Sequence, residues 1–217
     1  ARVIGVELDP RMCELLREDF AEEDRFSLIQ GDVLAGKHKL NPEVKKVLVE
    51  AGERAKVVGN LPFSTATPLV VRLVREVENL NLAVVTVQLE VAERFVAKPR
   101  TPQYGAVSVM AQCLGVVQKV RAINRRSFWP PPKVHGAIIR IKPKREGRPG
   151  ERVLSALEKV VRYSFDHRRK RLAKLLQRKW PSLHTEDLFE PEARAPDLTP
   201  QQYLRVAERL ALSEENP

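Results

Sequence analysis

The chain has 217 residues and a formal net charge of +10 at pH 7. Hydrophobic residues make up 43% and charged residues 30% of it, which indicates a globular protein and excludes a disordered or fibrous one. No stretch approaches the eighteen or so consecutive apolar residues of a membrane span, and the first residues lack a signal-peptide pattern. We therefore expect a soluble protein of the cytoplasm, or of an organelle. Its charge favours nucleic acid or an anionic membrane as partner.

The two cysteines exclude several classes of site. Cys13 and Cys113 are far apart and belong to no CxxC or Cys/His cluster. Neither a zinc site nor a disulfide framework is indicated, and we expect no metal. Both thiols are predicted to be buried, reduced core residues, since nothing nearby suggests the electropositive setting of a reactive thiol.

The first part of the chain alternates strands with helices. Residues 2–7 read as a buried strand ending in Glu7, after which Asp9 and Pro10 open a helix that runs to Phe20. Strands are predicted at 26–30 and 55–58, a helix at 67–78, and further strands or strand–helix pairs at 82–88, 107–117 and 136–141. Alternating units of this kind predict an α/β fold with a mostly parallel sheet and helices on both faces.

The composition changes at residues 142–150, which are charged, rich in Pro and Gly, and without apolar periodicity. Beyond this linker the apolar residues 153, 154, 157, 160 and 161 recur at helical spacing, as do residues 172, 175 and 176. The sequence therefore predicts an α/β domain over residues 1–145 and a small helical domain over 146–217.

Polar residues end three of the predicted strands. Glu7, Asp32 and Asn60 occupy these positions, and ligands of open parallel sheets bind outside the carboxyl ends of the strands. One carboxylate can accept both ribose hydroxyls of a nucleoside cofactor, and a second can accept from an adenine amino group. Taken singly, Glu7 and Asp32 are better explained as helix caps or solvated turn residues than as ligand contacts.

The tetrapeptide Asn60-Leu61-Pro62-Phe63 follows an apolar strand and precedes a helix. The side-chain oxygen of Asn60 and the backbone carbonyl of Leu61 or Pro62 could accept the two hydrogens of an adenine amino group while Phe63 stacks on the base. The nitrogen lone pair could then turn toward an electrophilic methyl group, with neither a metal nor a strong base. Asn-x-Pro is also a common turn, and Phe63 could be a core ring.

Six segments in order resemble the S-adenosylmethionine-dependent rRNA adenine dimethyltransferases of KsgA type, which are related to the erythromycin-resistance methyltransferases. They include the strand with Glu7, the Gly31-Asp32 turn and the Asn60 tetrapeptide. The other segments are Tyr104–Gln112, Phe128–Val134 and Phe165–Leu172. Together they span nearly the whole chain, and the ordered set is far more specific than any single motif.

The resemblance implies a Rossmann-like methyltransferase sheet that dimethylates adenines of small-subunit rRNA during ribosome biogenesis. S-adenosylmethionine is the implied cofactor, with Glu7 at its ribose, Asp32 at its adenine and Asn60 beside it. Asn60, Leu61, Pro62 and Phe63 are the implied catalytic motif, and Phe128 is expected to flank the target base.

The sequence departs from the family pattern in three places. The Gly-rich loop that follows the family's first strand has no counterpart, because the chain begins at what resembles the second strand. We therefore expect a sheet that lacks its first strand, and weak cofactor binding by this chain. Elsewhere, Leu89-Glu90 and His135-Gly136 replace the family's more usual residues. His135 is read as a surface or packing residue, since this amine methylation needs no base.

Cations cluster at two places in the sequence. Arg125, Arg126 and Lys133 bracket the aromatic pair Phe128-Trp129, an arrangement that suits RNA bases and phosphates. A second run is predicted on the first helix of the tail and comprises Arg168, Arg169, Lys170, Arg171 and Lys174. We expect both to bind RNA rather than to form a solvated helix face, and the run lacks the apolar opposite face of a membrane-binding helix.

Three functions compete. The first is an rRNA adenine dimethyltransferase that acts as a monomer on the small ribosomal subunit, with no membrane association. The second is a ribosome-assembly or organellar transcription factor that keeps the fold and the basic surface but transfers little or no methyl group. The third is a DNA adenine methyltransferase, in which two prolines more usually follow the Asp or Asn, whereas Leu61 stands at the first of these positions.

Overall fold

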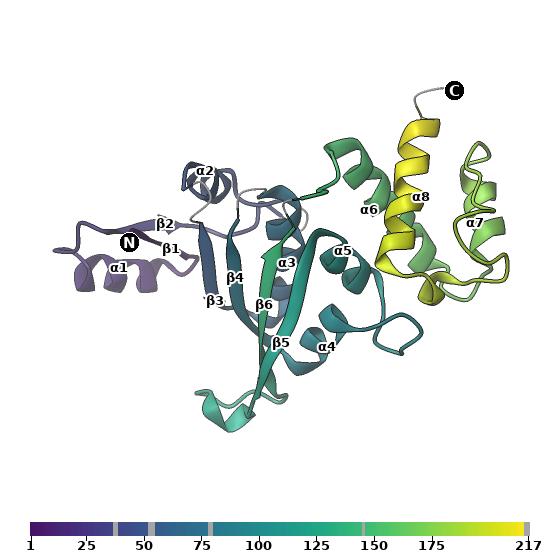
Figure 1. Cartoon of the computed structure of the whole chain (residues 1–217). Coiled ribbons are helices and arrows are strands. Elements are labelled where there is room, and N and C mark those ends of the chain that lie inside the picture. Colours follow the sequence, from purple (N-terminus) through teal and green to yellow (C-terminus); the bar gives the residue numbers. More distant parts are fainter. Residues whose placement is uncertain (37–38, 52–54, 78–79, 145, 215–217) are drawn as a thin grey trace.

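A computed structural model describes residues 1–36, 39–51, 55–77, 80–144 and 146–214, and Figure 1 shows its elements. The strands are β1 (Val3–Glu7), β2 (Phe26–Gln30), β3 (Lys56–Asn60), β4 (Leu82–Gln88), β5 (Gly115–Ile123) and β6 (Gly136–Pro143). The α-helices are α1 (Pro10–Asp19), α2 (Pro42–Glu50), α3 (Phe63–Glu76), α4 (Leu89–Val96), α5 (Ala106–Leu114), α6 (Glu151–Asp166), α7 (Leu172–Lys179) and α8 (Pro200–Ser213). None of the helices in the described ranges is long and apolar enough to cross a membrane.

The strands form two separate sheets. A four-stranded sheet has the order β3-β4-β6-β5, and β1 pairs only with β2. Within the described residues, β1 and β3 each therefore have one unpaired edge. In Figure 1, β1, β2 and α1 form a lobe to the side of the larger sheet.

The expectation of a mostly parallel sheet is corrected. The β1–β2 and β3–β4 pairs are parallel, but β6 pairs antiparallel with both β4 and β5. The reason is the direct connection between β5 and β6: no crossover helix lies between them, and two strands joined without a crossover pair antiparallel.

Local signals placed most of the early elements correctly. The side chain of Asp9 accepts a hydrogen bond from the backbone N–H of Arg11 at 2.8 Å and caps α1, as predicted. Helix α3 begins at Phe63, four residues before the predicted start, and contains Pro68 in its second turn. Proline favours the first turn of a helix, which is why the sequence predicted a later start. Helices α2 and α4 were not predicted.

The tail helices pack on α5 and share its core. One cluster of buried side chains contains residues of α3, α5, α6 and α8. The Tyr104 hydroxyl donates to the carbonyl of Leu198 at 2.8 Å, and the Cys113 thiol donates to the carbonyl of Pro200 at 3.1 Å. Cys13 and Cys113 are both buried, as predicted. The expected division at residues 145 and 146 stays a prediction, because the hydrophobic core is continuous across it.

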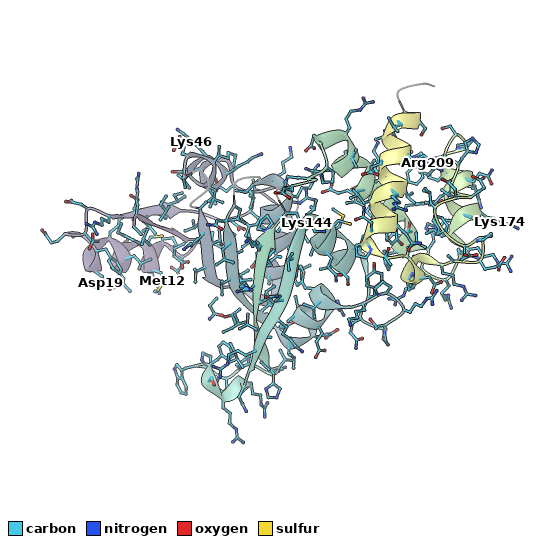
Figure 2. The ribbon with its side chains drawn as sticks, viewed as in Figure 1. Met12, Asp19, Lys46, Lys144, Lys174 and Arg209 are labelled. Atoms are coloured by element: carbon cyan, nitrogen blue, oxygen red, sulfur yellow. The ribbon has the colours of Figure 1, made fainter. Side chains whose placement is uncertain are left out.

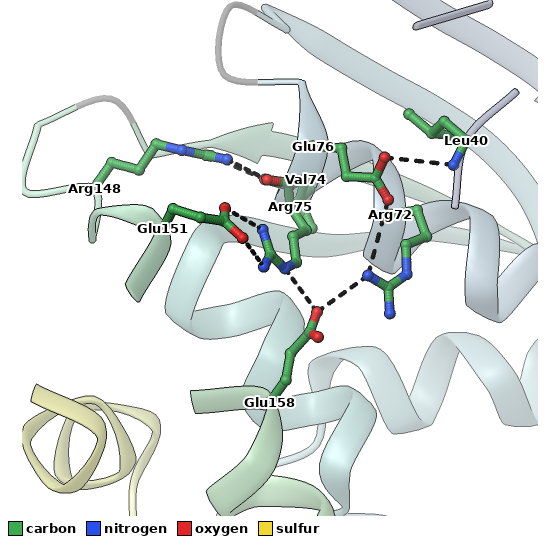
Figure 3. Close-up of polar contacts among 8 residues, drawn as sticks. All are labelled: Leu40, Arg72, Val74, Arg75, Glu76, Arg148, Glu151 and Glu158. Carbon is green, nitrogen blue, oxygen red and sulfur yellow. Dashed lines mark hydrogen bonds and ion pairs between the residues drawn. The ribbon is translucent and has the colours of Figure 1, made fainter. Parts of the chain in front are cut away.

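An ionic cluster also joins α3 to α6 (Figure 3). The guanidinium of Arg75 donates to both carboxylate oxygens of Glu151, at 2.6 and 2.8 Å, and to Glu158 at 2.7 Å. Arg72 donates to the same oxygen of Glu158 at 3.2 Å. Arg148, in the linker, donates to the carbonyls of the last turn of α3. The linker and α6 are thus fixed to the C-terminal end of α3.

Candidate functional site

Asn60 is the last residue of β3 and is exposed. It pairs with Thr86 of β4, and the backbone N–H of Leu61 donates to the carbonyl of Thr86 at 3.2 Å. Leu61 folds back over the preceding strand: its Cδ2 lies 3.0 Å from where a Cβ on Gly59 would be. A side chain at position 59 would therefore displace the Leu61 side chain. The strand end is thus fixed against β4, and Asn60 lies at the edge of the sheet.

The Pro62 carbonyl is already engaged. It accepts hydrogen bonds from the backbone N–H groups of Thr65 and Ala66 and from the Thr65 hydroxyl, each at 3.1 Å. A carbonyl oxygen has two lone pairs, so three donors fill its capacity. Of the two carbonyls that the sequence suggested as acceptors, Leu61 is therefore the better candidate. Phe63 begins α3, and its side chain lies outside the described residues.

Phe128 lies at the tip of the β5–β6 hairpin, between the short 3-10 turn η2 (Arg125–Ser127) and β6. Its ring packs over Gly136, where a Cβ would lie 3.0 Å from the nearest ring carbon. The backbone N–H of Arg125 donates to Nδ1 of His135 at 3.4 Å, and the His135 carbonyl accepts from Leu89 at 2.9 Å. His135 thus has a packing role at the surface, as predicted.

The strand register places Asn60 and Phe128 at the same edge of the four-stranded sheet. Asn60 pairs with Thr86, and Gln88, two residues further along β4, pairs with Gly136 beneath the Phe128 ring. Strand spacings of about 4.8 Å and a rise of about 3.3 Å per residue put the backbones of Asn60 and Gly136 about 12 Å apart.

Glu7 and Asp32 lie together at the carboxyl ends of β1 and β2, as their positions predicted. The backbone N–H of Gly31 donates to the Glu7 carbonyl at 2.8 Å. Glu7 Oε1 accepts from the N–H groups of Leu8 and Asp9, at 2.7 and 2.8 Å, and Asp32 Oδ1 accepts from Leu34 at 2.9 Å. Both carboxylates therefore also shape the turns in which they lie.

The structure does not bring these carboxylates to Asn60. Asn41 donates to the Asp32 carbonyl at 3.0 Å, and the adjacent Leu40 donates to Glu76, the last residue of α3, at 3.4 Å. Fourteen residues of helix span about 20 Å, and Asn60 lies next to the other end of α3. The predicted cofactor contacts and the predicted catalytic motif thus lie at opposite ends of this helix and in different sheets.

A family model described as "Ribosomal RNA adenine dimethylase" matches residues 1–212. The chain belongs to this family. It is 37% identical to the Ribosomal RNA small subunit methyltransferase A of Pseudomonas aeruginosa, over 97% of this chain and 76% of the relative. It is 33% identical to the protein of the same name from Phenylobacterium zucineum, over 100% of this chain and 73% of the relative.

Two solved structures are similar to this mixed α/β fold. A dimethyladenosine transferase from Plasmodium falciparum superposes with a TM-score of 0.78 at 21% identity, and the match covers 98% of this chain and 83% of that one. The 23S rRNA methyltransferase ErmE gives a TM-score of 0.64 at 25% identity, covering 96% and 82%. The likeness to the Plasmodium falciparum structure, at 21% identity, shows the fold alone.

The structure corrects the expectation that the basic run of Arg168–Arg171 and Lys174 lies on one helix. Arg168, Arg169 and Lys170 lie in the exposed turn between α6 and α7, not on a helix, and Arg171 is the N-terminal cap residue of α7. Arg168 donates to the carbonyl of Pro102 at 3.3 Å. Lys174 is on α7, and Figure 2 shows it on the outer side of the tail helices. Helix α6 ends early because His167 leaves the helical conformation, with φ −118° and ψ 36°.

The second cationic group stays together on the hairpin tip. Arg125, Arg126 and Lys133 are all exposed there, beside Phe128. The tip and the tail helices extend to different sides of the molecule (Figure 1). The residues predicted to bind RNA therefore form two separate surfaces.

Residues 104–112, part of the resemblance, have a packing role that sequence reasoning missed. The Ser108 hydroxyl accepts from the N–H of Gly105 at 3.1 Å and donates to the Arg94 carbonyl. The Gln112 side chain donates to the carbonyls of Phe95 and Ala97, each at 2.9 Å. These bonds cap the end of α4 against α5. Small and polar residues on an otherwise apolar helix were the available signal.

Proposed function

We propose that this chain transfers methyl groups from S-adenosylmethionine to the N6 atoms of adenines in small-subunit rRNA. The supporting observation is the exposed amide of Asn60 at the end of β3, next to a Pro62 carbonyl that the first turn of α3 already occupies. The chain's membership of the dimethylase family and its net charge of +10 support the same conclusion.

The residues at this edge can orient an adenine amino group. Asn60 Oδ1 accepts one N6 hydrogen, and the Leu61 carbonyl accepts the other. The Leu61 backbone is held in position before the base arrives, because its N–H donates to the Thr86 carbonyl. Holding both hydrogens in place leaves the nitrogen lone pair directed away from the ring plane. When bound, S-adenosylmethionine supplies an electrophilic methyl group.

No general base is needed in this arrangement. The lone pair of the methylated nitrogen is delocalised into the ring when the proton leaves, so this nitrogen is a weak base and releases its proton to water. His135 lies beside Phe128, but the backbone N–H of Arg125 donates to its Nδ1, so this ring helps to close the tip. Phe128 is held over Gly136, at the same edge of the sheet as Asn60.

The acceptor chemistry of Glu7 and Asp32 fits the ribose hydroxyls and the adenine amino group of the cofactor. Their placement in a separate sheet from Asn60 leaves that site unassembled. We propose that a further strand pairs with the unpaired edges of β1 and β3 and joins the two sheets. The support is that each of these strands has one neighbour among the described residues. Joining the sheets would turn the carboxylates toward Asn60.

The test is methyl transfer to small-subunit rRNA by the protein and by its Asn60→Ala variant. We expect the rate to fall by roughly 10²-fold or more, as when one preorganised hydrogen-bonding group is removed from an active site. RNA affinity should be unchanged. Asn81→Ala is the matched control, because Asn81 precedes β4 at the opposite edge of the sheet.

Two results would contradict the proposal in different ways. Equal methylation by wild type and Asn60→Ala would remove Asn60 from the catalytic role. Wild-type protein that binds rRNA but transfers no methyl group would instead favour a ribosome-assembly or transcription factor with this fold.

A further inference from the structure

The tip of the β5–β6 hairpin carries two adjacent aromatic residues in opposite environments. Phe128 is partly buried, with its ring over Gly136. Trp129 is 95% exposed, the most exposed of the large hydrophobic residues in the described part of the chain. Exposing an indole to water costs free energy, and because Trp129 is not buried, its side chain contributes no hydrophobic stabilisation to the fold.

The backbone around Trp129 is held in place. Asn124 Oδ1 accepts from the N–H of Arg126 at 3.0 Å, and the N–H of Phe128 donates to the Arg125 carbonyl at 3.3 Å. On the other side, Pro130, Pro131 and Pro132 follow directly and restrict the chain. The indole is therefore presented from a stiff support, which reduces the entropy lost when it binds a ligand.

The hairpin around it is purely cationic. Residues 115–143 contain no Asp or Glu. They contain seven cations: Lys119, Arg121, Arg125, Arg126, Lys133, Arg140 and Lys142. Lys119 lies 3.6 Å from Glu93 of α4, and the cations nearest the indole are the exposed Arg125, Arg126 and Lys133. A flat aromatic surface among cations is complementary to an unpaired nucleotide, whose base stacks while its phosphate meets a cation.

We propose that Trp129 is a base-stacking residue that binds an unpaired nucleotide of the RNA substrate next to the target adenine. The position next to the target follows from the register, which places the tip at the same edge of the sheet as Asn60. The inference rests on the proposed function in taking RNA as the ligand. Trp129 touches no reacting atom, so it acts on substrate binding and register and not on the chemical step.

Fluorescence can test stacking directly, because the chain has two tryptophans. Trp180 packs on Tyr163 in the tail, with ring centroids 5.6 Å apart. The Trp180→Phe variant keeps an aromatic ring there and leaves Trp129 as the single tryptophan. Titration with a single-stranded, adenine-containing oligoribonucleotide should quench its emission. Unchanged emission at saturating RNA would overturn the proposal.

Two substitutions separate stacking from apolar contact. Trp129→Leu removes the aromatic face and should weaken RNA binding by between about 5-fold and 100-fold, whereas Trp129→Phe should retain most of the affinity. The salt dependence should stay the same in both, because no phosphate contact is lost. Arg126→Ala is the matched control at the tip and should lower the salt dependence. Equal affinity of Trp129→Leu and wild type would overturn the proposal.

A membrane surface is the other possible ligand of an exposed indole beside cations. Quenching or a blue shift of Trp129 emission by anionic phosphatidylserine vesicles, with none by RNA, would assign the tip to a membrane and refute base stacking.

In methylation assays, Trp129→Leu should raise KM and leave kcat unchanged. If wild type transfers no methyl group yet RNA quenches Trp129, the proposed function fails and stacking stands. If Trp129→Leu methylates rRNA normally with an unchanged KM, base stacking by Trp129 fails and the proposed function stands.

Discussion

Arg75 of α3 donates a hydrogen bond from Nε to Glu158 of α6 at 2.7 Å and so connects the helix that starts at the candidate site to the tail. Only 10% of the Arg75 side chain is exposed, compared with 32% for Glu158 and 76% for Glu151. The paired carboxylates raise the pKa of Arg75, chiefly through its hydrogen bonds with Glu151. A largely buried guanidinium with three bonds to carboxylates fixes the angle between α3 and α6.

Replacing Arg75 by Met should therefore destabilise the protein. Removing one partner of a buried ion pair costs about 3–5 kcal/mol, and the exposure of Glu151 reduces this here to about 1–3 kcal/mol. Urea unfolding would measure the loss, and a double-mutant cycle with Glu158→Gln would isolate the pair. Arg94→Met is the control, since both members of its pair with Glu90 are more than half exposed. Additive effects of the two changes would show that the pair contributes nothing.

The same cluster makes stability depend on pH. The hydrogen bonds that Glu151 accepts from Arg75 lower the pKa of the Glu151 carboxyl from the usual value of 4.5. A carboxylate with a depressed folded-state pKa contributes stability above its unfolded pKa and loses it as the pH falls through the folded value. The difference in stability between wild type and Arg75→Met should therefore shrink below about pH 4.5. A difference that stays constant between pH 7 and pH 3 would show that packing, not charge, explains the effect.

Short-range signals in the sequence were sufficient for most elements near the candidate site. The predicted strands at 26–30 and 82–88 match β2 and β4, and Asp9 caps α1. The separation of the two sheets was missed, because strand pairing depends on contacts that are distant in sequence. The antiparallel β5–β6 pairing was missed because the segment predicted at 107–117 covers only the start of β5, which leads into β6 without a crossover helix. The basic run was assigned to a helix because residues 165–172 resemble the basic helix that opens the family's C-terminal domain, whereas the chain turns at His167.

The site was predicted residue by residue but not as an assembly. Asn60 lies at a strand end, and Glu7 and Asp32 lie together, because each of these relationships follows from strand direction within one sheet. The distance from Asn60 to Glu7 and Asp32 depends on what lies between β1 and β3. The spacing of apolar residues along the sequence does not predict this arrangement. The engagement of the Pro62 carbonyl depends on where α3 begins, and Pro68 misled the sequence reasoning about that point.

Cofactor affinity tests the role of the two carboxylates. Glu7→Gln or Asp32→Asn should weaken S-adenosylmethionine binding by about 1.5–3 kcal/mol, the contribution of a hydrogen bond to a charged group. Glu7→Gln keeps the oxygen that accepts from Leu8 and Asp9, so the turn should survive. Calorimetry measures the affinity, with the exposed Glu22→Gln as control in the same lobe. Unchanged affinity in both variants would remove these residues from the site.

The chain should bind S-adenosylmethionine weakly, because Glu7 and Asp32 are held at the opposite end of α3 from Asn60. Calorimetry measures this affinity. Tight binding would show that the two sheets do not need to be joined.

Both thiols should be unreactive in the folded protein. Burial raises the pKa of Cys113 to about 12, so hardly any thiolate is present at pH 8, and Cys13 is also buried. A thiol reagent that absorbs on reaction should label neither cysteine at pH 8 in native protein and both in urea. Rapid labelling of one native thiol, assigned by Cys113→Ser, would mean that the surrounding helices open readily.

The exposed turn between α6 and α7 should bind RNA phosphates. Reversing the charges of Arg168, Arg169 and Lys170 to Glu should weaken binding to small-subunit rRNA and reduce the salt dependence, since each lost contact removes about 0.7 from the slope of log K against log salt for single strands. Reversing the exposed Lys45, Lys46 and Lys56 changes the net charge equally and serves as control. Because Arg168 also bonds to Pro102, circular dichroism should first confirm the fold. If both triple variants lower the slope equally, the effect is one of net charge, and the turn is a solvated surface.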